Sequence, residues 1–223
     1  MNDDPLSAVF KLGEKDKMTE LLHGGHVFMN SLSYFAKLEN DSPRSDPDEG
    51  VGYYHQADGA TFQMQNDEQW TTIGAVRGGI RFRNNGLTPL NIYCLHSKKQ
   101  SQYGSPFKLD QLRLGDSYVL FLDVDEFIRR LRMAITKAGH ELRYGLVNYV
   151  DRQAYSGPMG TFSKFSEHAD QSEFRIVATP GTNSPISIRI GDLSDIAVMG
   201  STSERLLLDP KQPPHAMMEP VSL

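Results

Sequence analysis

The stretch YVLFLD, residues 118–123, is the clearest core element of the sequence. A short apolar run that is bounded by turn-forming residues is typical of a buried strand. Apolar residues then recur at helical spacing from Phe127 to Ile135. They predict a helix that is capped by Asp125 and ends near Gly139.

Further short strands are predicted on both sides of this element. They cover residues 9–12, 26–29, 70–75, 79–83, 91–96, 144–150, 173–179, 186–190 and 195–199. A helix is expected over residues 14–22, ended by Gly24-Gly25, and a turn or short helix over 31–38. Residues 51–68 are expected to be irregular, with room for one strand. Because strands outnumber helices and do not alternate regularly with long ones, the sequence favours an α+β fold over a doubly wound parallel sheet.

Composition places the chain among ordinary globular proteins, with 223 residues of which 39% are hydrophobic and 23% charged. We expect a single domain over residues 1–207 and a tail with little fixed structure over 208–223, which is rich in proline and polar residues. No stretch approaches the roughly 18 apolar residues of a membrane span, and no basic secretory signal opens the chain. One cysteine, Cys94, excludes an internal disulfide, so a cytoplasmic location is expected.

The formal net charge of -5 argues against non-specific nucleic-acid binding, which needs clustered lysine and arginine. One basic cluster, Arg129, Arg130 and Arg132, is more simply a solvated helix face, although a nucleic acid held in a local groove stays open. No phosphate-binding loop, dinucleotide fingerprint or nucleophile elbow is present, and the histidines lack metal-ligand spacing, so no metal is predicted. Cys94 beside His96 is more simply a buried structural cysteine than a nucleophile.

The segment QSEFRI, residues 171–176, places Glu173 at the start of an apolar strand, where glutamate is unusual. Gln171, two residues earlier, is expected to point to the same side. Such a carboxylate can accept a hydrogen bond from a ribose hydroxyl and stabilise positive charge at an anomeric carbon, while the amide orients the attacking group. The simpler alternative is an edge carboxylate paired with Arg175 or a nearby lysine.

The order of these segments resembles that of the ADP-ribosyltransferase-like fold, especially its bacterial toxin and anti-phage members that modify nucleic acids. Those chains open with a strand, a helix, a glycine turn, a second strand and an aromatic segment, matched here by residues 9–12, 14–22, 24–25, 27–29 and 34–35. They close on a Gln-x-Glu strand, matched by residues 171–173. Uncharacterised bacterial proteins with a lysine in the first strand and an Arg-x-Asp-x-x-Glu-Gly loop are similar too, matched by Lys11 and residues 44–50.

The resemblance implies two packed, mostly antiparallel β-sheets with a few short helices, and transfer of ADP-ribose from NAD to a nucleic acid or protein acceptor. It implies a toxin or antiviral defence effector, with an antitoxin or partner chain and no membrane. The implied catalytic residues are Glu173 and Gln171, the implied NAD contacts are Lys11, Asn30, Ser31, Tyr34 and Phe35, and the implied acceptor contacts are Arg44, Asp46 and Glu49. Lys11 stands where the family usually has arginine or histidine.

Several simpler or competing interpretations stay open beside this one. Tyr34 and Phe35 can be plain core, and Lys164 is more simply a solvated lysine than a pocket residue. The chain can be a catalytically inactive binding or sensing module of the same fold. It can also be a metal-dependent nuclease that uses Asp46, Asp48 and Glu49, although acidic loops are usually only solvated.

Overall fold

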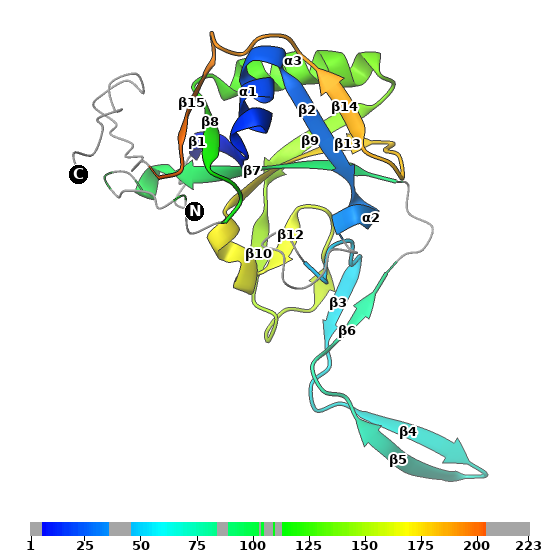
Figure 1. Cartoon of the computed structure of the whole chain (residues 1–223). Coiled ribbons are helices and arrows are strands. Elements are labelled where there is room, and N and C mark those ends of the chain that lie inside the picture. The colour runs from blue at the N-terminus through cyan, green and yellow to red at the C-terminus, as the bar shows by residue number, and fades with distance from the viewer. Residues whose placement is uncertain are drawn as a thin grey trace.

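Strand β7 (Asn91–Lys99) is the axis of the main sheet of the computed structural model, which describes residues 6–35, 46–83, 89–102, 104, 109 and 113–203. The predicted tail, the turn predicted at residues 84–86 and Arg44 lie outside the described residues. Eight strands form this sheet, in the order β14-β2-β7-β1-β8-β15, with β13 and β9 continuing from β7 (Figure 1). Every pairing in it is antiparallel.

The strands of this sheet follow the predicted positions, except that the single strand predicted at 144–150 is divided into β9 and a separate strand over 148–150 in another sheet. Their bounds are β1 (Leu6–Gly13), β2 (His26–Ser31), β8 (Ser117–Phe121), β9 (Glu141–Leu146), β13 (Glu173–Thr179), β14 (Ile186–Arg189) and β15 (Ala197–Ser201). The mostly antiparallel α+β class expected from the sequence is therefore confirmed.

The main sheet is split along one edge of β7. On one side, β13 pairs with β7 from Asn91 to His96 without a break. On the other side, β2 pairs only with Asn91 and Ile92, and β1 pairs only from His96 onward. The intervening residues 93–95 therefore have no strand partner on that edge among the described strands. The sheet opens there, between β1 and β2.

Two helices build the main core against the sheet. Helix α1 (Lys15–Gly24) and helix α3 (Val124–Lys137) bury their apolar faces on strands from both halves. Helix α1 ends at Gly25, whose backbone is left-handed (φ 56°), as the Gly-Gly pair predicts. The predicted cap of α3 is wrong by two residues, because the side chain of Asp123, and not of Asp125, accepts the Glu126 N–H at 2.9 Å. A four-residue helix, α2 (Leu32–Phe35), follows β2.

A smaller layer packs beside the main sheet and has its own core of Val51, Tyr54, Met159 and Phe165. It contains the parallel pair β10 (Asn148–Val150) and β12 (Ser163–Phe165), and the three-stranded sheet of β11 (Gly157–Pro158), β3 (Tyr53–Gln56) and β6 (Gly79–Phe82). The chain also has two short 3-10 turns, η1 (Gln100–Gln102) and η3 (Ser166–Gln171). The last of these turns leads directly into β13.

A hairpin of β4 (Thr61–Asn66) and β5 (Gln69–Ala75) projects from this layer as an arm (Figure 1). Its strands pair only with each other among the described strands. The prediction of an irregular segment over 51–68 with room for one strand is therefore wrong, because β3 and β4 both lie in it. Strand β5 confirms the strand predicted at residues 70–75, whereas β4 was missed because its sequence is rich in Gln and Asn and neither face of the arm is buried.

No helix in the described part of the chain is both long enough and apolar enough to cross a membrane.

Candidate functional site

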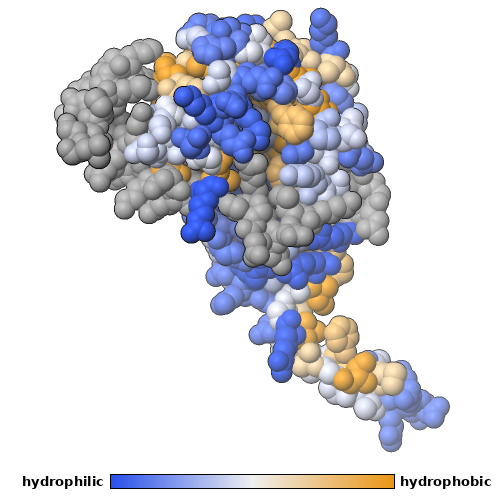
Figure 2. All heavy atoms as spheres, in the orientation of Figure 1, coloured by the Kyte–Doolittle hydropathy of each residue, from blue (hydrophilic) through white to orange (hydrophobic). Residues whose placement is uncertain are grey.

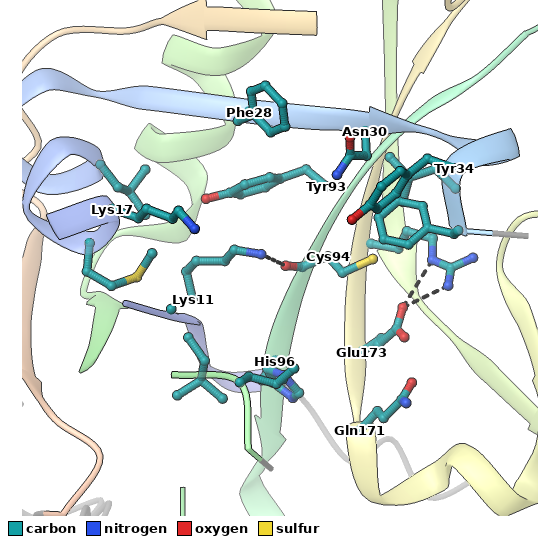
Figure 3. A pocket seen from close by; sticks show the side chains of 18 of the residues that line it. Lys11, Lys17, Phe28, Asn30, Tyr34, Tyr93, Cys94, His96, Gln171 and Glu173 are labelled. Atoms are coloured by element: carbon teal, nitrogen blue, oxygen red, sulfur yellow. Dashed lines mark hydrogen bonds and ion pairs between the residues drawn. The ribbon is translucent and has the colours of Figure 1, made fainter. Parts of the chain in front are cut away.

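A cavity of about 460 Å³ lies where the main sheet opens between β1 and β2. This volume is within the range of ligand pockets, which are usually about 300–1,000 Å³. Strands β1, β2, β7 and β13 and helices α1 and α2 all contribute to its wall. Figure 3 shows how their side chains converge. The edge of β7 that has no strand partner among the described strands therefore lines the cavity.

Most of the sequence-predicted site residues line this one cavity. They are Lys11, Asn30, Tyr34, Phe35, Glu49, Gln171 and Glu173. Ser31 and Asp46 do not line it. Ser31 is buried and caps α2, since its hydroxyl accepts the Tyr34 N–H at 3.3 Å. Arg44 lies outside the described residues.

Glu173 is the carboxylate at one end of the cavity. Its side chain is only 7% exposed, and each oxygen has its own cation. Lys164 Nζ donates to Oε1 at 2.6 Å, and Arg175 Nη2 donates to Oε2 at 2.8 Å. Burial alone would raise the pKa of Glu173, but Arg175 and Lys164 outweigh it and lower the pKa to about 2. Glu173 is therefore ionised at every physiological pH and can act as an acceptor or as a fixed charge.

Lys164 was expected to be a solvated lysine, but its side chain is buried beside Gln171 and Glu173. Its ammonium contacts the side chains of both Gln171 and Glu173, with a distance of 2.8 Å to Gln171 Oε1. Burial opposes its charge, yet the negative charges of Glu173 and Glu49 raise its pKa. This role was not predicted, because Lys164 lies in β12, a three-residue strand that the sequence pattern does not indicate.

Gln171 and Glu173 do share a side, as predicted, but strand alternation is not the cause. Gln171 ends the turn η3, and Ser172 between them has a left-handed backbone (φ 43°). The common contact with Lys164 holds the two side chains together. The Tyr149 hydroxyl, which accepts the Glu173 N–H at 2.9 Å, fixes the start of β13.

The acidic segment 46–50 is not a solvated loop, because Asp46, Asp48 and Glu49 are all buried. Glu49 accepts a two-pronged pair of hydrogen bonds from Arg175, at 2.9 and 3.0 Å. Asp46 lies 3.6 Å from Lys164 Nζ. This segment therefore supports the cations that hold Glu173.

Asp48 points away from this cluster and pairs with Arg81 and Arg152. Burial opposes its ionisation, but these two guanidinium groups lower its pKa. The three carboxylates of the segment thus pair with different cations. Among the described residues, no group of three or more His, Cys, Asp or Glu side chains is placed to hold a metal ion.

Lys11 occupies the opening between β1 and β2. Its Nζ donates to the carbonyl of Cys94 at 2.7 Å, where β7 lacks a strand partner, and lies 4.5 Å from the centre of the Tyr93 ring. Lys17 of α1 lies beside it on the cavity wall (Figure 3). Lys17 also pairs with Glu14 at 2.8 Å on the exposed surface. The cavity therefore has two lysines across from the Glu173 end, and Lys11 in particular is suited to an anionic group.

Tyr34 and Phe35 are not core residues, so the simpler interpretation of this pair is wrong. Their rings meet edge to face, with 5.4 Å between the centroids, and Tyr34 is exposed at the rim. Tyr93 and Phe28 add two further aromatic rings to the wall (Figure 3). Flat apolar ligands bind well to such faces.

His96 and Cys94 both line the cavity in their uncharged forms. Burial, together with the charge of Lys11, lowers the pKa of His96 to about 4, although its hydrogen bond to the Gln171 backbone opposes this. Burial and the charge of Glu173 raise the pKa of the Cys94 thiol to about 12. A thiol that stays protonated is a poor nucleophile. Sequence reasoning placed both residues in a buried strand and had no signal for the opening above them.

Two arginines of the basic cluster on α3, Arg129 and Arg130, form ion pairs on the protein surface. Arg129 and Arg130 both donate to Glu126, and Arg130 also pairs with Asp195. These contacts agree with a solvated helix face.

No protein-family model, no curated protein and no solved structure matches this chain.

Proposed function

We propose that this chain is an ADP-ribosyltransferase that binds NAD in the cavity and transfers ADP-ribose to a macromolecular acceptor, as a toxin or antiviral effector. The observation that carries the proposal is the meeting of Glu173, Gln171, Lys11 and Tyr34 around one cavity, although they come from three separate segments.

The chemistry of the wall suits each part of a dinucleotide. Lys11 and Lys17 offer positive charge to a diphosphate, and the aromatic side chains offer flat surfaces to a base or to nicotinamide. Asn30 presents an amide to a carboxamide or ribose oxygen. Glu173, at the far end, then faces the ribose that carries nicotinamide.

The reaction breaks the bond between the nicotinamide nitrogen and the ribose anomeric carbon, and nicotinamide leaves with the electron pair. The acceptor then bonds to that carbon and gives up its proton. Positive charge that develops on the ribose is stabilised by fixed negative charge nearby. Three carboxylates, Asp46, Glu49 and Glu173, surround two cations, Lys164 and Arg175, which leaves one negative charge at this end of the cavity.

A second candidate is a binding or sensing module of the same shape without catalysis. It is favoured by the pairing of both Glu173 oxygens with cations, because a carboxylate that is held this way has less attraction left for a ribose cation. Both candidates bind NAD in the cavity, but only the transferase breaks it down.

The decisive experiment measures NAD binding by calorimetry and nicotinamide release by the full chain, with RNA, DNA and protein acceptors. Glu173→Gln keeps the size of the side chain and removes its charge, and Glu141→Gln makes the same change on the exposed end of β9. Turnover that is lost in Glu173→Gln and kept in Glu141→Gln supports the transferase. Binding without turnover supports the module, and the absence of NAD binding overturns both.

A further inference from the structure

We propose that the β4–β5 arm joins two copies of this chain, by antiparallel pairing of the free edge of β5 with the same edge in the second copy. Every residue of both strands is exposed, and four of them are large and apolar: Phe62, Met64, Trp70 and Ile73. Figure 2 shows apolar side chains along the arm, which ends in a hydrophilic tip. Exposed apolar surface of this kind marks an interaction site.

The edges of the arm carry little protection against strand pairing. Proteins usually block such edges with lysine, proline or a β-bulge; residues 61–75 contain no lysine or proline, and their one register shift lies at Ile73. An isolated two-stranded hairpin is also only marginally stable in water. Additional strands in the same sheet would pair the open backbone groups of the edge and support the hairpin. We infer that strand addition is its purpose.

Charge decides which kind of partner fits. Asp67 and Glu68 at the tip are the only charged residues of the segment 61–75. A nucleic acid would be repelled, since its binding needs lysine or arginine, and an acidic tip does not enter a lipid bilayer. The partner is therefore a protein strand.

A second copy of the chain supplies the matching charge. Arg77 is exposed two residues after the end of β5, at the base of the arm. Antiparallel pairing of β5 with β5 brings the acidic tip of each copy, where Asp67 lies in the turn, to the base of the other copy, where Arg77 lies. Like charges at the two tips are then kept at opposite ends of the new sheet.

Strand β5 pairs regularly with β4 from Gln69 to Thr72, and its register shifts at Ile73. The regular part carries the exposed side chain of Trp70, beside which a second strand would lie. Pairing through β4 would instead bring the acidic tip toward Asp58, at the other side of the base. Charge complementarity therefore selects β5.

The test uses the full chain, without any assumption about its ligand. Sedimentation velocity over a wide range of protein concentration should show a dimer. Trp70, the only tryptophan of the chain and 65% exposed in the single copy, should shift its fluorescence to the blue as the dimer forms. A chain that stays monomeric with unchanged emission overturns the proposal.

Charge reversal tests the antiparallel pairing of the two copies. Asp67→Arg alone and Arg77→Asp alone should each weaken the dimer at least tenfold, and the double variant should regain it. The double variant should not pair with the unchanged chain, because like charges then meet at both ends. Glu141→Arg, an exposed reversal on the body, should leave the dimer constant unchanged. Equal weakening by Glu141→Arg, or no rescue in the double variant, would overturn the pairing.

Discussion

The ammonium of Lys164 lies 2.6 Å from Glu173 Oε1, and neither side chain is more than 7% exposed. Arg175 donates a hydrogen bond to the other oxygen of the same carboxylate, and its guanidinium also donates to Glu49. One buried chain of charges therefore connects β12, β13 and the segment 46–50, and this chain forms one end of the cavity. The free energy of folding and the shape of the site depend on the same few atoms.

Removing one member of this chain should be costly to folding. Lys164→Met leaves Glu173 with a single cation, and breaking a buried pair in this way typically costs about 3–5 kcal/mol. Glu173→Gln combined with Lys164→Met should cost less than the two single changes added together, because the charges are removed as a pair. Urea unfolding at pH 7 measures all three. Strictly additive costs would mean that the two side chains do not interact.

Acid should weaken the fold in two separate steps. The pKa of Glu173 is lowered to about 2 from an ordinary 4.5, so the unfolded chain binds this proton first. Its contribution to stability is complete above about pH 4.5 and is lost as the pH falls toward 2. Glu173→Gln should flatten the stability profile in that window. An unchanged slope below pH 4.5 would contradict the ion pairs described here.

The second step belongs to His96, at higher pH. Its pKa falls to about 4 from 6.5, so the folded chain resists protonation that the unfolded chain accepts. Stability is complete above about pH 6.5 and drops as the pH falls toward 4, by on the order of 3 kcal/mol. NMR should find the His96 ring neutral at pH 6, and His96→Gln should remove this step. Titration of the ring near pH 6.5 would show that it is solvated.

Sequence reasoning located seven residues of the cavity wall but not the way in which they are held. The resemblance, read from the order of strand, helix, glycine turn and strand near the N-terminus and from the Gln-x-Glu start of β13, named Lys11, Asn30, Tyr34, Gln171 and Glu173 together. Apolar patterning finds such elements because each of them buries one face.

The remaining features depend on contacts that no local pattern carries. Lys164 lies in a three-residue strand, and Asp46 and Glu49 lie in an acidic segment whose composition is that of a surface loop. Their burial is made possible by Arg175, 126 residues away from Glu49 in the sequence. In the arm, β5 was predicted and β4 was not, because the arm buries neither face and β4 alternates apolar and polar residues only from Phe62 to Gln65.

The thiol of Cys94 should be unusually slow to react. At pH 8 a pKa of about 12 leaves roughly a thousandfold less thiolate than the ordinary value of 9. Alkylation of the folded chain by iodoacetamide should be slower by a similar factor than that of the urea-unfolded chain. Since Cys94 is the only cysteine and lines the cavity, a bound ligand should slow the reaction further. Rapid labelling of the folded chain would mean that the thiol, which is partly exposed in the cavity, is not held in its protonated form.

Asn30 and Ser31 are adjacent, yet the structure gives them different tasks. Asn30 lines the cavity, whereas the hydroxyl of Ser31 is directed to the start of α2 and to Ser33. If NAD occupies the cavity as proposed, Asn30→Ala should weaken its binding about tenfold, the usual effect of one lost hydrogen bond to a ligand. Ser31→Ala should instead lower the unfolding free energy by about 1 kcal/mol, because a helix cap is lost. Calorimetric titration with NAD and urea unfolding of both variants separate the two effects. Equal loss of binding in the two variants would indicate that Ser31 faces the ligand, and that β2 enters the cavity differently from the arrangement described.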